Sequence, residues 1–270
     1  MANRIDRKLE ELKKAGRTAL VPFLTVGYPD VETSKALAEV IIESGGDILE
    51  LGIPFSDPLA EGLTVQKTSF RALEHGVNLD TSLELVRYLR NKGVEAPLIF
   101  MGYYNTFLHY GVEAFVRAAH DAGLDGVIVV DLPTEESGPF KELCRDAGIY
   151  LIPLLAPTST DQRIARACKD ANGFIYCVSL TGVTGARNAM AGDLPELVRR
   201  IRLHTDLPVL MGFGISSREH VEAVGRFADG AVVGSALLEA IGAAPPGKVL
   251  EAASDFIRGL STPATTEHRE

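Results

Sequence analysis

Apolar residues along the chain fall into short continuous runs that are separated by longer segments with helical spacing. Runs of this length without alternation are typical of parallel strands that are buried on both faces. Between the runs, apolar residues recur three and four positions apart, which is the spacing of one helix face. The pattern predicts eight strands, at residues 19–25, 48–53, 98–101, 126–130, 150–155, 174–178, 209–211 and 230–233.

Helical segments fill the intervals between these strands. Before the first strand, Ile5, Leu9 and Leu12 share one face of a short helix that ends near Gly16. We expect this helix to plug or cap the body of the fold. Two helices are expected within residues 64–92, with a break at 75–78, and the others at 31–44, 112–122, 135–147, 161–169, 194–203, 217–227, 235–241 and 248–260.

The regular succession of strand and helix predicts a (β/α)8 TIM barrel with an extra N-terminal helix. Such barrels typically have ~250 residues, and this chain has 270. A doubly wound open sheet is the competing architecture, but no GxGxxG fingerprint follows the first strand. We expect one barrel domain over residues 1–260 and a polar, poorly ordered tail over 261–270.

The composition excludes several classes of function. A net charge of −9 and the lack of a Lys/Arg run argue against a nucleic-acid surface. The charged N-terminus has no apolar signal region, and no apolar run is long enough to span a bilayer, so we expect a cytoplasmic protein. The six histidines have no paired metal-ligand spacing, so no metal site is expected. Without CxxC spacing, Cys144, Cys168 and Cys177 are expected to be reduced and structural.

Two carboxylates stand out around the second predicted strand. Glu50 lies inside its apolar run, and Glu61 lies at the far end of the loop that follows. A buried carboxyl is costly unless it is paired or its pKa rises until it holds its proton near neutral pH. The alternative is that Glu50 lies at a strand end and reaches solvent or an arginine. Because these barrels place their chemistry at the C-terminal ends of the strands, the position favours acid–base catalysis, with Glu61 facing Glu50 across a substrate.

Glycine-rich loops follow the last two predicted strands, where such barrels often bind phosphate. Residues 211–216 contain two glycines, and Gly234 comes directly before a predicted helix that begins at Ser235. Glycines let the backbone approach an anion, and a helix N-terminus offers free N–H groups. We expect a phosphate site here, the alternative being two ordinary turns. The Gly- and Thr-rich loop at 179–190 is expected to act as a lid, the alternative being a flexible connector.

Four segments are similar to the tryptophan synthase alpha subunit family. They are PFLTVGYP at 22–29, LELGIPFSDPLA at 49–60, residues 179–185 and GFGIS at 212–216. The resemblance implies a (β/α)8 barrel that cleaves indole-3-glycerol phosphate to indole and glyceraldehyde 3-phosphate, a retro-aldol reaction of tryptophan biosynthesis. It also implies that this chain holds no cofactor. The implied partner is a beta subunit that carries pyridoxal phosphate, receives indole through a tunnel and completes an alpha2beta2 heterotetramer.

The resemblance also implies roles for individual residues. Glu50 would protonate the indole ring carbon as the carbon–carbon bond breaks, and Glu61, kept ionised by solvent, would accept a hydrogen bond from the indole N–H. Thr184 would hydrogen-bond the second carboxylate when the lid closes. The implied indole pocket consists of Phe23, Tyr103, Ile128, Tyr176 and Phe213, the phosphate cradle of Gly185, Gly214, Gly234 and Ser235, and the face toward the beta subunit of Asp57, Pro58 and Asn105. By itself, Tyr176 is as typical of a core residue as of a ligand contact.

One position departs from the family pattern. The family has Asp-Gly-Pro where this chain has Glu61, Gly62 and Leu63. The extra methylene displaces the carboxylate, and a displacement on the order of 1 Å can cost about a hundredfold in rate. Three alternatives therefore stay open: a free-standing indole-3-glycerol phosphate lyase, a catalytically weakened regulatory alpha subunit, and, more remotely, an unrelated phosphate-binding barrel such as a phosphosugar isomerase.

Overall fold

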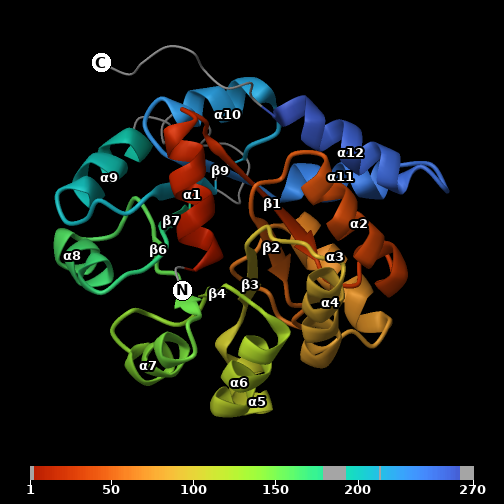
Figure 1. Cartoon of the computed structure of the whole chain (residues 1–270), viewed down its shortest axis with the longest axis horizontal. Coiled ribbons are helices and arrows are strands. Elements are labelled where there is room, and N and C mark those ends of the chain that lie inside the picture. The colour runs from red at the N-terminus through yellow and green to blue at the C-terminus, as the bar shows by residue number, and fades with distance from the viewer. Residues whose placement is uncertain (1–2, 179–192, 213, 262–270) are drawn as a thin grey trace.

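Parallel strands occupy the centre of the molecule, and helices surround them (Figure 1). The structure is a computed structural model that describes residues 3–178, 193–212 and 214–261. The strands neighbour one another in the order β5-β4-β3-β2-β1-β9-β8-β7-β6. Within the described residues they are β1 (Ala19–Thr25), β2 (Leu49–Gly52), β3 (Leu98–Gly102), β4 (Gly126–Val129), β5 (Tyr150–Leu151), β6 (Leu154–Leu155), β7 (Ile175–Val178), β8 (Val209–Gly212) and β9 (Gly230–Val233).

The strand predicted at 150–155 is divided into β5 and β6, and this division is where the sheet closes. On one side, the Ile152 N–H donates to the Val127 carbonyl at 2.9 Å, and on the other the Tyr176 N–H donates to the Pro153 carbonyl at 3.1 Å. Pro153 interrupts the ladder because proline has no N–H to donate. One stretch of chain thus pairs with both β4 and β7, so the nine short strands make eight positions around a closed barrel.

Alternation along each strand decides which side chains enter the barrel. On β2 and just before it, Leu49 and Leu51 pack in the outer core under the helices, whereas Ile48 belongs to the cluster inside the barrel. Successive strand residues point to opposite faces, so Glu50 shares the inner face with Ile48. The interior cluster also contains residues of the other strands, among them Ile99, Ile128 and Tyr176.

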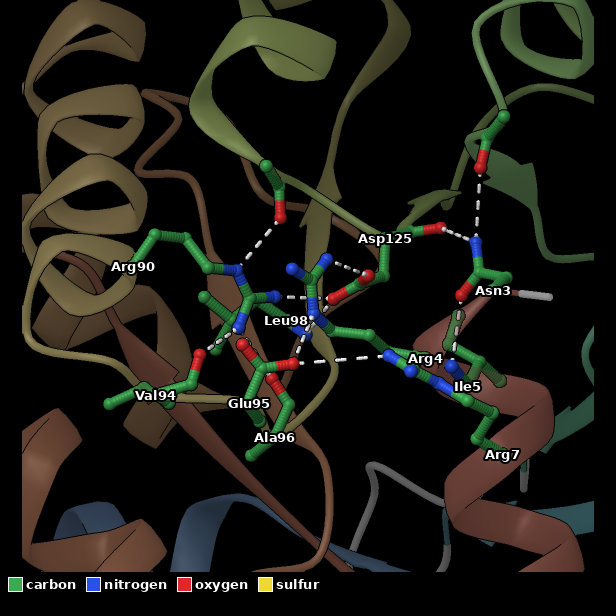
Figure 2. A network of polar contacts seen from close by, with 12 residues as sticks. Asn3, Arg4, Ile5, Arg7, Arg90, Val94, Glu95, Ala96, Leu98 and Asp125 are labelled. Carbon is green, nitrogen blue, oxygen red and sulfur yellow. Dashed lines mark hydrogen bonds and ion pairs between the residues drawn. The ribbon is translucent and has the colours of Figure 1, made fainter. Parts of the chain in front are cut away.

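The helix α1 (Arg4–Lys14) plugs the barrel at the N-terminal ends of the strands, as its apolar face predicts. The three apolar residues that define this face are buried, and all three belong to the interior cluster. Asn3 caps α1 by accepting the Ile5 N–H at 2.9 Å, and its amide donates to the carbonyls of Asp125 at 2.9 Å and Gly148 at 3.1 Å (Figure 2). Because Asp125 precedes β4 and Gly148 precedes β5, the plug is attached to the start of both strands.

The remaining helices follow the predicted spacing with two differences. The helix expected over 135–147 begins only at Gly138, and residues 104–110 form a helix that was not predicted, because Phe107 is its only buried residue and no apolar period results. No helix in the described ranges is both long and apolar enough to cross a membrane. The helices are α2 (Val31–Glu43), α3 (Leu63–Glu74), α4 (Leu79–Asn91), α5 (Tyr104–Tyr110), α6 (Val112–Ala122), α7 (Gly138–Asp146), α8 (Asp161–Lys169), α9 (Asp193–Arg202), α10 (Arg218–Gly225), α11 (Ser235–Ala243) and α12 (Val249–Leu260).

Candidate active site

Glu50 is a buried carboxyl on the inner face of the barrel. It lies on β2 between Phe23 of β1 and Ile99 of β3, and 1% of it is exposed. Neither of its carboxylate oxygens has a hydrogen-bond partner among the described residues. The alternative that Glu50 reaches solvent or an arginine is therefore wrong in this structure.

The surroundings of Glu50 favour its protonated form. Burial, followed by the negative charge of Glu61, raises the pKa of Glu50 to about 8. The Tyr176 hydroxyl, which lies nearby, opposes this shift in part, although its geometry falls short of a hydrogen bond to the carboxylate. A carboxyl in this state can donate a proton at neutral pH and take one back.

Glu61 lies at the end of the loop that joins β2 to α3, and it is half-buried. Burial raises its pKa to about 7. The expectation that solvent keeps Glu61 ionised is thus wrong, because the loop folds over the mouth of the barrel and removes part of the water around the carboxyl. The two carboxyls therefore titrate in similar pH ranges, and the charge of Glu61 raises the pKa of Glu50.

A cavity at the mouth of the barrel brings several predicted residues together. Phe23, Pro58, Glu61 and Tyr103 line it, although they come from β1, the β2–α3 loop and the end of β3. The sequence interpretation missed the other lining residues. Three of them, Gly52, Met101 and Val130, could be found from the alternation of side chains along the strands, because they share the inner face with Glu50 and Ile128. The complete set of missed residues is Thr25, Gly52, Ile53, Val65, Ser69, Met101, Gly102 and Val130.

Two glycines make room for aromatic rings at this mouth. A Cβ atom at Gly52 would lie 2.3 Å from Cζ of Phe23, and one at Gly212 would lie 2.8 Å from the Tyr176 hydroxyl. Any larger residue would push the ring away. The rings of Phe23 and Tyr176 can therefore lie across the neighbouring strands only because these two positions carry no side chain.

The described part of the expected phosphate cradle lies after β8 and β9. Gly214 has a φ of +48°, which L-residues with a side chain rarely adopt. Gly234 precedes α11, and no side chain caps the N-terminus of this helix, which begins at Ser235. The first N–H groups of α11 are thus available for an anion.

Three predicted site residues cannot be placed. Thr184 and Gly185 of the expected lid, and Phe213 of the expected indole pocket, lie outside the described residues, as does most of the expected tail at 261–270. Ile128 is buried inside the barrel but does not line the cavity at its mouth.

The residues expected to face a partner lie beside exposed apolar side chains. Asp57 and Asn105 are exposed, and Pro58 is half-buried. Near them in the sequence, Leu59 is 88% exposed, Leu63 74% and Leu108 56%. These exposed leucines lie on the β2–α3 loop, at the start of α3 and on α5, which are the segments that carry or adjoin the expected partner residues.

A larger cavity, of about 260 Å³, lies between the segments that follow β4 and β5 and the helices α7 and α8. Asp131, Lys141 and Arg163 line it together with apolar residues, and it contains neither Glu50 nor Glu61. The smaller cavity is the candidate active site because Glu61 lines it. Phe23, which also lines it, is the neighbour of Glu50 across the β1–β2 pair. Among the described residues, no three His, Cys, Asp or Glu side chains are arranged to hold a metal ion.

Comparisons with known proteins agree on one family. The model of the family described as tryptophan synthase alpha chain matches residues 9–260. The tryptophan synthase alpha chain of Roseiflexus sp. (strain RS-1) is 50% identical over 258 residues, which cover 96% of this chain and 99% of that protein. Among solved structures, tryptophan synthase subunit alpha from Legionella pneumophila str. Paris is 38% identical with a TM-score of 0.89, covering 96% of this chain and 97% of that one. Tryptophan synthase from M. tuberculosis in an aminoacrylate-bound form is 33% identical with a TM-score of 0.86, covering 96% and 98%.

Proposed function

The chain belongs to the tryptophan synthase alpha chain family, and on that premise we propose how its own residues carry out the family's reaction. The reaction is the cleavage of indole-3-glycerol phosphate to indole and glyceraldehyde 3-phosphate by a carbon–carbon lyase that needs no cofactor on this chain. The single observation that carries the assignment of roles is Glu50, a buried carboxyl without a partner and with a pKa of about 8.

Glu50 acts as both the acid and the base. Below a pKa of about 8 it is mostly protonated, so at neutral pH it gives its proton to the indole ring carbon that is joined to the glycerol chain. The resulting carboxylate takes the proton of the hydroxyl on the adjacent carbon. As that O–H bond breaks, a carbonyl forms, the carbon–carbon bond breaks and its electron pair returns to the ring. Glu50 ends the cycle protonated, as it began.

Glu61 stabilises the charge that develops during this cycle. Protonation of the ring carbon places positive charge on the indole nitrogen, and a carboxylate that accepts the indole N–H stabilises this charge. With a pKa of about 7, Glu61 is ionised in about half of the molecules at neutral pH. The N–H of bound indole would favour the ionised form.

The mouth of the barrel supports binding of the two ends of this substrate. Phe23 and Tyr103 line the cavity beside Glu61, which suits a flat aromatic ring. Gly214, Gly234 and Ser235 supply a glycine turn and an uncapped helix N-terminus, which suit a phosphate group. Thr184, Gly185, Ile128, Tyr176 and Phe213 complete the proposed site.

The partner is a beta chain that carries pyridoxal phosphate, and we propose an alpha2beta2 heterotetramer. The similarity to M. tuberculosis tryptophan synthase supports this assembly. The exposed leucines beside Asp57, Pro58 and Asn105 support the position of the contact, because a partner would remove this apolar surface from water. Size exclusion with and without a beta chain tests the assembly. Indole release that is equally fast in both cases, without complex formation, would favour a free-standing lyase.

Replacement of Glu50 by Gln tests the assignment of the acid and base. Glutamine keeps the shape but cannot transfer a proton, and we expect indole release to fall by about 10²- to 10⁴-fold. Indole release from indole-3-glycerol phosphate is measured with the purified chain alone and with a beta chain. The control is Glu142→Gln, an exposed position on α7. Full turnover by Glu50→Gln would refute the assignment.

A weakened regulatory alpha subunit is the second candidate, and the raised pKa of Glu61 is the observation that favours it. A carboxyl that is half protonated at neutral pH stabilises positive charge less well. The test is Glu61→Asp, with kcat measured from pH 6 to pH 9. A large rise in kcat would favour the weakened subunit, and a kcat that stays equal or falls would refute it.

A further inference from the structure

We propose that Gln66 is a positioning residue for Glu61. The inference rests on the catalytic role of Glu61 given above.

The backbone on both sides of the Glu61 side chain is fixed by two side chains, that of Tyr103, which follows β3, and that of Gln66 in α3. The Ala60 N–H donates to the Tyr103 hydroxyl at 2.9 Å, and the Gln66 amide donates to the Glu61 carbonyl at 2.9 Å. The Glu61 N–H itself donates to the Pro58 carbonyl at 3.0 Å. These three bonds hold the backbone before and after Glu61. With the backbone fixed, the position of the Glu61 carboxylate depends only on the rotamer of its side chain.

Both anchoring residues are held in turn by rigid structure. Gln66 lies in the first turn of α3, where its N–H donates to the Gly62 carbonyl at 3.0 Å. The Tyr103 ring stacks on Phe55 at the beginning of the same loop, with ring centroids 4.7 Å apart and 17° between the planes. Tyr103 therefore joins the start of the loop to its end, while Gln66 joins the end to the next helix.

The start of the loop is also tied to α3. The Phe55 N–H donates to the Ser69 hydroxyl at 3.0 Å. Ser69 is one helical turn after Gln66, so both ends of the loop are attached to the same helix. Removal of Gln66 leaves the Phe55 and Tyr103 contacts in place and frees only the Glu61 carbonyl, which makes its effect local.

The consequence for the reaction follows from the role of Glu61. Burial is the one influence found on the Glu61 carboxyl among the described residues, so this group is free to meet a substrate N–H. Its longer arm can reach the ring only if the backbone is correctly placed, and a displacement on the order of 1 Å can cost about a hundredfold in rate. The bond from Gln66 supplies that placement.

The test is a double-mutant cycle between Gln66→Leu and Glu61→Ala, with kcat and KM for indole-3-glycerol phosphate measured in the complex with a beta chain. We expect Gln66→Leu to lower kcat by roughly 10- to 100-fold with little change in KM, because the charge on the ring develops only as the reaction proceeds. In the Glu61→Ala background the same change should cost less than about 2-fold, since a positioning residue has nothing left to position. Equal losses in both backgrounds would overturn the proposal. The control is Lys67→Gln, the next residue on α3, which is exposed and should leave kcat unchanged.

A second measurement keeps the proposal separate from the proposed function. Amide hydrogen exchange by NMR should show faster exchange at Glu61 in Gln66→Leu, with the amides of the α3 interior unchanged. Unchanged exchange at Glu61 would overturn the inference even if the enzyme is active. If Glu61→Ala releases indole as fast as the unaltered chain, the catalytic role of Glu61 is refuted. Gln66 is then also refuted as a positioning residue, although its effect on the amide exchange of Glu61 can still be observed.

Discussion

Two carboxylates are buried at opposite ends of this barrel, and their surroundings differ in almost every respect. Asp125 lies where β4 begins, at the end plugged by α1, and Glu50 lies on β2 toward the open mouth. The Asp125 carboxylate accepts hydrogen bonds from the Arg90 guanidinium at 2.5 Å, the Leu98 N–H at 2.8 Å and the Arg4 guanidinium at 3.1 Å (Figure 2). Glu50 receives no hydrogen bond from any described residue.

The difference shows how one fold uses buried charge for two purposes. Burial raises the pKa of Asp125, but two guanidinium groups and a backbone N–H oppose the shift and stabilise the carboxylate. The side chain thereby joins α1, α4 and β3. At Glu50 nothing comparable opposes burial, so the carboxyl keeps its proton. The first arrangement stabilises structure, and the second suits the proposed role of Glu50 as an acid and base.

The largest effect at and below neutral pH is expected from removal of the Asp125 side chain. Asp125→Ala leaves Arg90 buried without its carboxylate, and breaking a buried pair in this way costs about 3–5 kcal/mol of the free energy of unfolding. Denaturant titration followed by circular dichroism measures it. The matched control is Asp229→Ala, which loses the Val209 N–H at 2.9 Å and Arg202 at 3.1 Å at a half-exposed site, and should cost less. Equal losses of stability in the two variants would show that burial does not explain the large contribution of Asp125.

The next effect is the pH dependence of stability caused by Glu50. Its pKa is about 8 in the folded chain and near 4.5 in the unfolded chain, so the unfolded state ionises first as the pH rises. The folded chain therefore loses stability relative to Glu50→Gln by about 1.4 kcal/mol per pH unit between these values, and the loss levels off above pH 8. Denaturation of both variants from pH 4 to pH 9 measures the difference.

The sign of that difference distinguishes the two ends of the barrel. Glu50→Gln should become the more stable variant as pH rises, whereas removal of Asp125 destabilises the chain. The exposed control Glu142→Gln should show no such divergence. If the difference in free energy of unfolding between Glu50→Gln and the unaltered chain is the same at every pH, the Glu50 carboxyl is not desolvated. The contrast between Glu50 and Asp125 is then refuted.

The smallest effect is expected at the helix cap beside Asp125. Asn3→Ala should cost about 1 kcal/mol for the lost cap of α1, and somewhat more because its amide also donates to the carbonyls of Asp125 and Gly148. Asn78→Ala is the matched control, since Asn78 caps α4 by accepting the Thr81 N–H at 3.1 Å. A smaller loss at Asn3 than at Asn78 would show that the plug is not held by these bonds.

Much of the fold could be predicted because the relevant signals are local. The continuous run 19–25 and the spacing of the apolar residues in α1 each lie within a few residues, and both elements form as predicted. The division of the strand at Pro153 was missed, since an apolar run does not reveal which neighbours its backbone will bond. The short α5 was missed because a single buried Phe107 makes no period.

The site was predictable only in part. Alternation from Ile48 places Glu50 inside the barrel, and the glycines after β8 and β9 indicate an anion site. The hydrogen bond between Ala60 and Tyr103 had no signal in the sequence, because the two residues are 43 positions apart and meet only after β2 and β3 pair. The bond from Gln66 to the Glu61 carbonyl is local, but it depends on how the loop enters α3.

By itself, the sequence determined the class of fold, the family and the identity of the two acidic residues at the mouth, because periodicity and residue type act over short distances. Only the tertiary structure decided that Asp125 is paired and Glu50 is not, and that Glu61 loses enough water for its pKa to reach about 7. The physical reason is that the pKa of a carboxyl depends on the groups and the water around it. Those surroundings come from distant parts of the chain, and they exist only once the barrel has closed.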